Sequence, residues 1–322
     1  MKEFDLIKTY FKEQSVSRKD VLIGIGDDCA LIAPSEKQNI AITTDTLVAG
    51  VHFPEDTPPR AIGHKAIAVN LSDLAAMGAD PSWVSVAITL PNVDEEWVGE
   101  FCTGMFELCE YYNVQLIGGD TTQGPLSITV TAQGLVPHNQ QITRSGAKAG
   151  DWVYVTGEIG GAALALQHYY QKLTLVPEVL RVVQERLDLP MPRVLAGQAL
   201  RQYASSAIDL SDGLIADLTH ICEASSVGAN IILDKLPVPA EVLQVLGTEQ
   251  AIDLALTGGD DYELLFTVNE DNKVGMETAL TDMGIKLSCI GQLNGSQKIT
   301  ALLNEKPVEI KAEGYQHFVD GV

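Results

Sequence analysis

The stretch from Trp83 to Thr121, WVSVAITLPNVDEEWVGEFCTGMFELCEYYNVQLIGGDT, indicates the fold class of this chain. Its first eight residues are rich in β-branched side chains and end at Pro91, as expected of a strand. Residues 94–112 begin on an acidic turn and then repeat apolar side chains at helical spacing. A second apolar run at 114–117 leads into Gly-Gly-Asp. A strand, a helix and a strand in this order indicate a mixed α/β domain.

The same alternation extends over all 322 residues, a length typical of two domains. Upstream, the patterns predict a helix at 3–14, strands at 21–25 and 39–44, and an Ala-rich helix at 60–77; a strand at 126–136 follows the quoted stretch. Further on they predict helices near 161–171, 176–187, 193–204 and 212–226, and strands near 152–156, 206–209, 229–233, 262–268 and 286–291. The polar segment 138–150 is typical of a linker between an N-terminal domain, residues 1–137, and a C-terminal domain, residues 151–322. The expected fold class is α/β, with two mixed-sheet domains.

Charge and cysteine content disfavour several classes of protein. The chain has 21 basic and 43 acidic residues, a net charge of −22, and no run of Lys or Arg, so we expect neither nucleic acid nor membrane as a partner. A hydrophobic fraction of 46% indicates a folded protein. We see no signal peptide or apolar run long enough to span a membrane. The five cysteines lack C-x-x-C spacing, which favours reduced thiols in a cytoplasmic protein.

Aspartates recur at or near the predicted ends of apolar strands. Six short segments carry them: Gly26–Asp28, Thr43–Thr46, Asn70–Asp73 in the Ala-rich helix, Gly118–Thr121, Asp209–Gly213 and Gly258–Asp261. Ordinary turn chemistry explains any one of these segments, and a helix cap explains Asp212. Together they can converge at one edge of a sheet, which is where ligands bind in open α/β sheets.

Clustered carboxylates repel one another, so such a site needs cations. Mg²⁺ suits Asp carboxylates, Thr and Ser hydroxyls and substrate phosphates, and the neighbouring glycines let the backbone approach a phosphate closely. The familiar nucleotide motifs are missing: there is no G-x-x-x-x-G-K-[ST], no G-x-G-x-x-G and no kinase-type H-R-D or D-F-G segment. A phosphate-handling site in this chain would therefore depend on metals and carboxylates.

Seven segments resemble the thiamine-monophosphate kinase family: GIGDDCA (24–30), TDTLVAGVHF (44–53), AVNLSDLAAMGA (68–79), IGGDT (117–121), TRSGA (143–147), IDLSDG (208–213) and GGDDYE (258–263). They occur in the family's order and span nearly the whole chain. The combination is specific, although no single segment is. The wider superfamily, which includes aminoimidazole ribonucleotide synthetase and selenophosphate synthetase, shares the architecture and the use of ATP.

The resemblance implies ATP-dependent phosphorylation of thiamine monophosphate to thiamine diphosphate, the last step of its biosynthesis, with several Mg²⁺ ions. It also implies a homodimer in which the N-terminal domains pair. Carried over by position, the magnesium ligands would be Asp28, Thr43, Thr44, Asp45, Asp73, Asp120, Asp209 and Asp212. The ATP contacts would be Gly119, Asp120, Arg144 and Ser211, and the substrate contacts His52, Asp260 and Tyr315. Asp27 has no assigned role, and the family commonly has glutamate where this chain has Asp260.

The implied acceptor is a phosphate monoester, whose second pKa is near ~6, so at pH 7 it is largely ionised and needs no general base. The protein has to position two polyanions in line and neutralise their repulsion, which Mg²⁺ and Arg144 can do. Tyr315 can stack against the substrate's cationic ring.

Two other functions remain open on the residues alone. One is a different ATP-dependent synthetase of the same superfamily, although the early reactive cysteine of selenophosphate synthesis is missing. The other is a metal-binding protein without chemistry, which would need neither Arg144 nor His52. Outside the resemblance, His52 and Tyr315 are explained by packing and Arg144 by a loop charge, and Lys65 is expected to be solvated.

Overall fold

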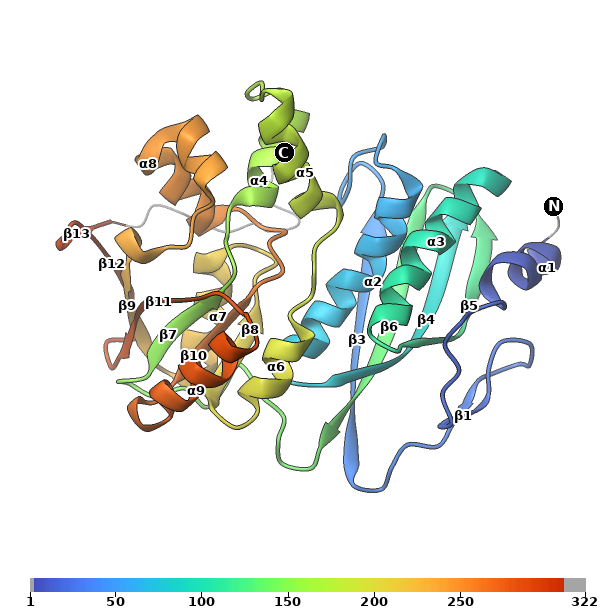
Figure 1. Cartoon of the computed structure of the whole chain (residues 1–322), viewed down its shortest axis with the longest axis horizontal. Helices are drawn as coiled ribbons and strands as arrows, with labels where there is room; N and C mark the ends of the chain where they lie inside the picture. The colour runs from blue at the N-terminus through green and yellow to red at the C-terminus, as the bar shows by residue number, and fades with distance from the viewer. Residues whose placement is uncertain (1–2, 310–322) are drawn as a thin grey trace. The chain divides into compact units, whose positions relative to one another are not determined.

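The computed structural model describes residues 3–309 and divides into two compact units (Figure 1). Unit 1 comprises Met1–Leu74, Ala79–Asn139 and Asp188–Val194; unit 2 comprises Ala75–Gly78, Gln140–Leu187 and Leu195–Val322. Each unit has its own main β-sheet flanked by helices. The predicted α/β class with two mixed-sheet domains is therefore confirmed. None of the helices among residues 3–309 combines the length and apolar character that a membrane crossing requires.

Unit 1 is built on a four-stranded sheet in the order β3-β6-β4-β5. Strands β4 and β5 are parallel and joined by α3, so the strand, helix and strand predicted from the sequence form a β-α-β unit; β6 pairs antiparallel with both β3 and β4. Strands β1 and β2 form a separate hairpin. The bounds are α1 (Glu3–Leu6), η1 (Ile7–Phe11), β1 (Val21–Ile23), β2 (Leu31–Ile32), β3 (Gln38–Val48), α2 (Pro59–Ala76), β4 (Asp80–Leu90), α3 (Glu95–Tyr111), β5 (Gln115–Gln123) and β6 (Ser127–Pro137).

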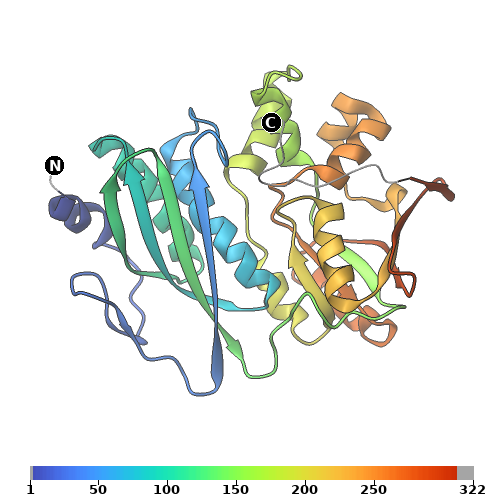
Figure 2. The same ribbon diagram turned by 180° about the vertical axis from the view of Figure 1, so that it is seen from behind.

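Helices α2 and α3 lie against one face of this sheet, and the view from behind shows no helix from the described part of unit 1 over the other face (Figures 1 and 2). The residues of β6 alternate accordingly. Ile128 and Val130 are buried on the helix side, whereas Thr129 and Thr131 point away from it and bond the hydroxyls of Thr46 and Thr44 on β3. The sheet therefore has one apolar face under the helices and one face lined by threonines.

Helices α2 and α3 approach each other closely at two glycines. A Cβ on Gly63 would lie 2.0 Å from the carbonyl oxygen of Phe101, and a Cβ on Gly104 would lie 1.9 Å from that of Arg60. Real Cβ atoms do not approach a backbone oxygen this closely, so each glycine is required by the spacing of the helices rather than by its dihedral angles.

We expect Gly104→Ala to destabilise the protein by about 3 kcal/mol, because the added methyl group forces α2 and α3 apart. Gly99→Ala is the matched control: it lies on the same helix, and its new Cβ would meet only Tyr10 Cε1 at 3.5 Å. The control should be neutral or stabilising by up to ~1 kcal/mol, since alanine is the better helix former. Urea unfolding measures both, and equal effects at the two positions would refute the packing explanation.

Unit 2 contains a seven-stranded sheet in the order β13-β12-β9-β11-β7-β10-β8. Its neighbours are antiparallel except for β9 and β12. The bounds are β7 (Trp152–Thr156), α4 (Gly161–Tyr169), α5 (Pro177–Asp188), α6 (Val194–Leu200), β8 (Ala204–Asp209), α7 (Leu214–Ser225), β9 (Gly228–Ile232), η2 (Leu233–Lys235), α8 (Ala240–Thr257), β10 (Leu264–Val268), α9 (Glu270–Asp282), β11 (Leu287–Asn294), β12 (Ile299–Leu303) and β13 (Lys306–Val308).

Two strands of unit 1 run further than the sequence predicts, and this changes where their acids lie. Strand β3 continues to Val48 because its later residues keep pairing with β6. Strand β5 continues to Gln123 along β4, with Gly119 so close to Val86 that a Cβ would lie 1.9 Å from its carbonyl oxygen. The expectation that Asp45 and Asp120 follow their strands is therefore wrong, since both lie inside edge strands.

Candidate active site

Three of the predicted metal ligands meet between β3 and α2. Alternation along β3 directs Thr43 and Asp45 to the face covered by α2, which carries Asp73. Thr43 Oγ1 donates a hydrogen bond of 2.5 Å to Asp73 Oδ2. Thr44 lies on the opposite face, where its hydroxyl is 2.9 Å from that of Thr131. The structure thus groups Thr43, Asp45 and Asp73 and directs the side chain of Thr44 away from them.

The two carboxyl groups between β3 and α2 repel each other. Burial raises the pKa of Asp45, and the charge and hydrogen bonding of Asp73 raise it further, to about 6. Such a pair, next to a threonine hydroxyl, is a set of hard oxygen donors with excess negative charge. Mg²⁺ typically takes one or two protein carboxylates and completes its shell with water and substrate phosphates. The donor set therefore fits this ion.

His52 lies in the turn that follows β3, and a hydrogen bond from the backbone orients its ring. The backbone N–H of Val48 donates to Nδ1 of His52 at 3.1 Å, so this nitrogen is an acceptor and the neutral ring carries its proton on Nε2. Lys65 Nζ lies 3.4 Å from the carbonyl oxygen of His52. The expectation that Lys65 is solvated is wrong: it is only 3% exposed, because α2 is buried almost all round at this turn.

Three further predicted site residues and the adjacent Asp27 line one cavity of about 650 Å³ in unit 1. The cavity lies between the loop of the β1–β2 hairpin and strand β5 and is lined in part by Asp27, Asp28, Gly119 and Asp120. Both hairpin aspartates and Asp120 are exposed. Asp27 Oδ1 accepts the N–H of Asp28 at 2.9 Å, which shapes the loop. These side chains can reach a ligand or a cation that enters the cavity.

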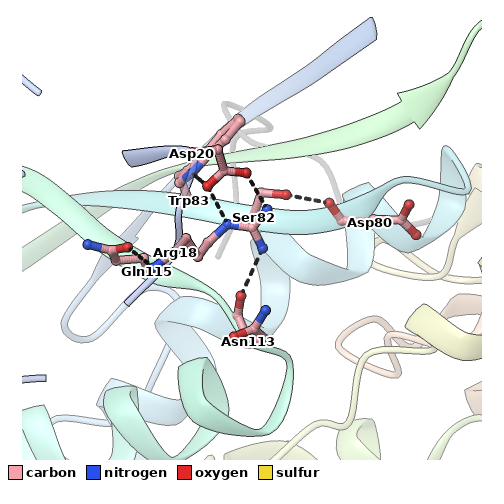
Figure 3. Close-up of polar contacts among 7 residues, drawn as sticks. All are labelled: Arg18, Asp20, Asp80, Ser82, Trp83, Asn113 and Gln115. Carbon is pink, nitrogen blue, oxygen red and sulfur yellow. Dashed lines mark hydrogen bonds and ion pairs between the residues drawn. The ribbon is translucent and has the colours of Figure 1, made fainter. Parts of the chain in front are cut away.

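A polar network anchors the segment that leads into this hairpin (Figure 3). The guanidinium of Arg18 bonds both carboxylate oxygens of Asp20, at 3.0 and 2.7 Å, and lies over the ring of Trp83. Trp83 Nε1 donates to Asp20 at 3.2 Å, Arg18 Nη1 donates to the carbonyl of Asn113, and Arg18 N donates to the side chain of Gln115. Burial alone would raise the pKa of Asp20, but the charge and hydrogen bonds of Arg18, together with hydrogen bonds from Trp83 and the backbone, lower it below its usual value. The network ties the hairpin that carries Asp27 and Asp28 to β4 and β5.

The two acidic groups of unit 1 lie at opposite edges of the sheet. Asp45, Val130, Val86 and Gly119 are register partners on β3, β6, β4 and β5. Three strand spacings separate the ends of this row by ~14 Å, so one ion cannot bridge Asp45 and Asp120. Among residues 3–309, no three His, Cys, Asp or Glu side chains lie close enough to form a metal cluster.

Unit 2 brings a third set of predicted residues together at the end of β8. Asp209 is the buried last residue of this strand, and Ser211 and Asp212 follow it. The segment 258–263 lies beside them: the N–H of Asp260 donates to the carbonyl of Ser211 at 3.0 Å. The alternative that Asp212 caps α7 is wrong, since Gly213 occupies the N-cap position and no side chain caps it.

Sequence reasoning missed Asp217, which lies in the first turn of α7 and is 2% exposed. Its carboxylate accepts the N–H of Asp212 at 3.2 Å. Burial raises its pKa, the charge of Asp212 raises it further, and the charge of Arg144 lowers it, with a result of about 7. Because its charge affects Asp217, Arg144 lies near these acids of unit 2, and its own side chain is exposed. The available sequence signal was an acid directly after three apolar residues at the start of this helix. Tyr315 lies outside the described residues.

Comparisons with known proteins identify both halves of the chain. Residues 26–136 match the family model of the AIR synthase related protein, N-terminal domain, and residues 148–304 match that of the C-terminal domain. The chain is also 50% identical to the thiamine-monophosphate kinase of Escherichia coli (strain K12) over 319 residues, which is 98% of each chain. The chain belongs to the thiamine-monophosphate kinase family. The family and the enzyme class predicted from the seven segments are confirmed.

Solved structures of thiamine-monophosphate kinases have the same fold. The crystal structure from Stenotrophomonas maltophilia K279a is 41% identical, with a TM-score of 0.85 over 91% of this chain and 93% of that chain. AaThiL complexed with AMPPCP and TMP is 30% identical, with a TM-score of 0.77 over 98% of this chain and 96% of that chain. The described residues therefore have the architecture of the family.

Proposed function

We propose that this chain phosphorylates thiamine monophosphate to thiamine diphosphate with ATP as the donor, the last step of thiamine diphosphate biosynthesis. The observation that carries the proposal is its similarity, over 98% of its length, to AaThiL complexed with AMPPCP and TMP. AMPPCP is an ATP analogue, so that complex holds counterparts of donor and acceptor. The three acidic groups support the proposal, because two polyanionic substrates require cations bound to the protein.

Roles for individual residues are part of this proposal. The N-terminal domain, residues 1–137, carries the metal and nucleotide site and the dimer contact; the linker is 138–150, and the C-terminal domain, 151–322, completes the site. The proposed magnesium ligands are Asp28, Thr43, Thr44, Asp45, Asp73, Asp120, Asp209 and Asp212. The proposed ATP contacts are Gly119, Asp120, Arg144 and Ser211, and the proposed substrate contacts are His52, Asp260 and Tyr315.

The proposed chemistry is direct in-line transfer of the γ-phosphoryl group to the phosphate of thiamine monophosphate. Because that phosphate is already ionised near pH 7, the protein needs to position it rather than deprotonate it. Asp45 and Asp73 would hold Mg²⁺, which supplies charge neutralisation when bound. Arg144 contributes a fixed positive charge toward the triphosphate. His52, with Nδ1 held by the backbone, presents Nε2–H as a donor.

Incubation of the purified protein with Mg-ATP and thiamine monophosphate, followed by chromatography, tests the proposal. We expect thiamine diphosphate and ADP in equal amounts. Free thiamine, tested in parallel, should not be phosphorylated, because its hydroxyl group needs a general base. Absence of thiamine diphosphate under saturating conditions would rule out the proposed reaction and favour another ATP-dependent enzyme of the superfamily.

We further propose a homodimer that pairs the threonine-lined faces of the unit 1 sheets, in a cytoplasmic protein. Ile42 on this face is 67% exposed and Ile40 is 38% exposed, and pairing of the two faces would bury both side chains. All five cysteines are free thiols, which suits a reducing compartment.

Ile42→Lys is expected to convert the dimer to a monomer, because it would bury two charges at the two-fold contact. Val274→Lys is the matched control, since Val274 is 72% exposed on α9 of unit 2. Light scattering after size exclusion should give twice the chain mass for the wild type and the control. A wild-type monomer, or a dimeric Ile42→Lys variant, would contradict this interface.

A further inference from the structure

We propose that Tyr262 is a positioning residue that holds the carboxylate of Asp260 for thiamine monophosphate. The inference deepens the proposed function and rests on it, because Asp260 is its proposed substrate contact. Tyr262 Oη donates a hydrogen bond of 2.9 Å to Asp260 Oδ1. Tyr262 is only 8% exposed, whereas Asp260 is half-buried. A fixed, buried hydroxyl thus restrains a carboxylate that ligands can approach.

The backbone around this pair is fixed on one side by the loop after β8. Asp260 N donates to the carbonyl of Ser211 at 3.0 Å, and Tyr262 N donates to that of Leu210 at 2.8 Å. A Cβ on Gly259 would lie 2.3 Å from the carbonyl oxygen of Ser211, so the two segments are in close contact. Asp260 and Tyr262 are therefore tied to the loop that carries the proposed ATP contact Ser211.

Asp261, the residue between Asp260 and Tyr262, is held by the segment before helix α4. Both carboxylate oxygens of Asp261 accept the N–H of Gly160, at 3.0 and 2.8 Å, just before helix α4. The side chain of Asp261 thus satisfies a backbone N–H at the N-terminal end of that helix, which has no acceptor within the helix itself. Because Asp261 bonds Gly160, and its two neighbours bond the loop after β8, this stretch cannot move without breaking bonds on both sides.

The backbone conformation indicates that this geometry serves the site. Asp260 has φ of 66° and Tyr262 has φ of 50°, in the left-handed region. Aspartate tolerates this region, but a bulky aromatic residue there is an outlier. Strained residues of this kind persist where the surrounding structure fixes them, and they cluster at functional sites. Glycine would relieve the strain at position 262 but would lose the hydroxyl that bonds Asp260.

A double-mutant cycle tests the inference. Wild type, Tyr262→Phe, Asp260→Ala and the double variant are compared by steady-state kinetics with thiamine monophosphate and ATP varied in turn. Removing one hydrogen bond to a charged group is expected to raise KM for thiamine monophosphate about tenfold in Tyr262→Phe, with KM for ATP unchanged. In the Asp260→Ala background, Tyr262→Phe should have no further effect, since Tyr262 acts through Asp260.

Tyr154→Phe is the matched control, because it removes a buried hydroxyl that donates to Glu277 at 2.5 Å in the same unit. This control should leave KM for thiamine monophosphate unchanged. Equal rises in both KM values, or additive effects of Tyr262→Phe and Asp260→Ala, would overturn the positioning role. An unchanged KM in Asp260→Ala would overturn it too. Failure of the wild type to form thiamine diphosphate would instead overturn the proposed function, before any variant is compared.

Discussion

Asparagine in place of Asp45 is expected to lower kcat by about a thousandfold or more while the protein remains folded. The change keeps the size of the side chain and removes the charge that would hold Mg²⁺ between β3 and α2. Losing several kcal/mol of transition-state stabilisation corresponds to this factor, at 1.36 kcal/mol per tenfold. Steady-state kinetics at saturating substrates measure it. Asp282→Asn makes the same chemical change at an exposed position on α9 and should leave kcat unchanged.

The same variant has a stability signature in the absence of Mg²⁺. The pKa of Asp45 is raised from 3.8 to about 6, so the folded protein binds this proton more tightly than the unfolded chain does. The resulting contribution to the free energy of unfolding is fully present below pH 3.8 and is lost as the pH rises through about 6. Asp45→Asn should therefore melt at a higher temperature than the wild type at pH 7.5, and at nearly the same temperature at pH 3.5. A variant that is less stable than the wild type at pH 7.5 would show that the two acids do not repel each other.

Removal of divalent cations is expected to abolish turnover completely, and added Mg²⁺ should restore it. The apparent affinity for Mg²⁺ should fall as the pH is lowered through about 6, because the ion competes with the proton on Asp45. Calorimetric titration at pH 5.5 and 7.5, without nucleotide, measures this difference. The same titration of Asp45→Asn should lack the component that changes with pH. Full activity in excess chelator, or an affinity independent of pH, would contradict the assignment of this metal site.

The fold could be predicted from local patterns where those patterns are long. The β-branched residues of β4, the acidic first turn of α3 and the apolar run before Gly-Gly-Asp in β5 correctly predicted a strand, a helix and a strand in this order. The ends of the strands were not predictable in the same way, because they depend on the partner strand. Strand β5 extends past Gly119 only because β4 lies beside it, and a single sequence does not contain that pairing.

The candidate site was predictable to the extent that it depends on residue type. Asp45 and Asp73 could be nominated from the sequence, yet their repulsion follows from a contact 28 residues apart in the chain. Tyr262 and Asp217 were not singled out, since their roles arise from hydrogen bonds to Asp260 and Asp212 that only the folded chain forms. Burial of Lys65 was also missed, because only the packing of the folded chain leaves its helix without a solvated face at that turn.

Transfer of label from γ-³²P-ATP to thiamine monophosphate tests the central claim most directly. The proposed reaction predicts that the purified protein, with Mg²⁺, places one label in each thiamine diphosphate formed, at the terminal phosphate, and releases one unlabelled ADP. Label that appears only in inorganic phosphate, with thiamine monophosphate recovered unchanged, would contradict the claim that this chain is the kinase of that acceptor.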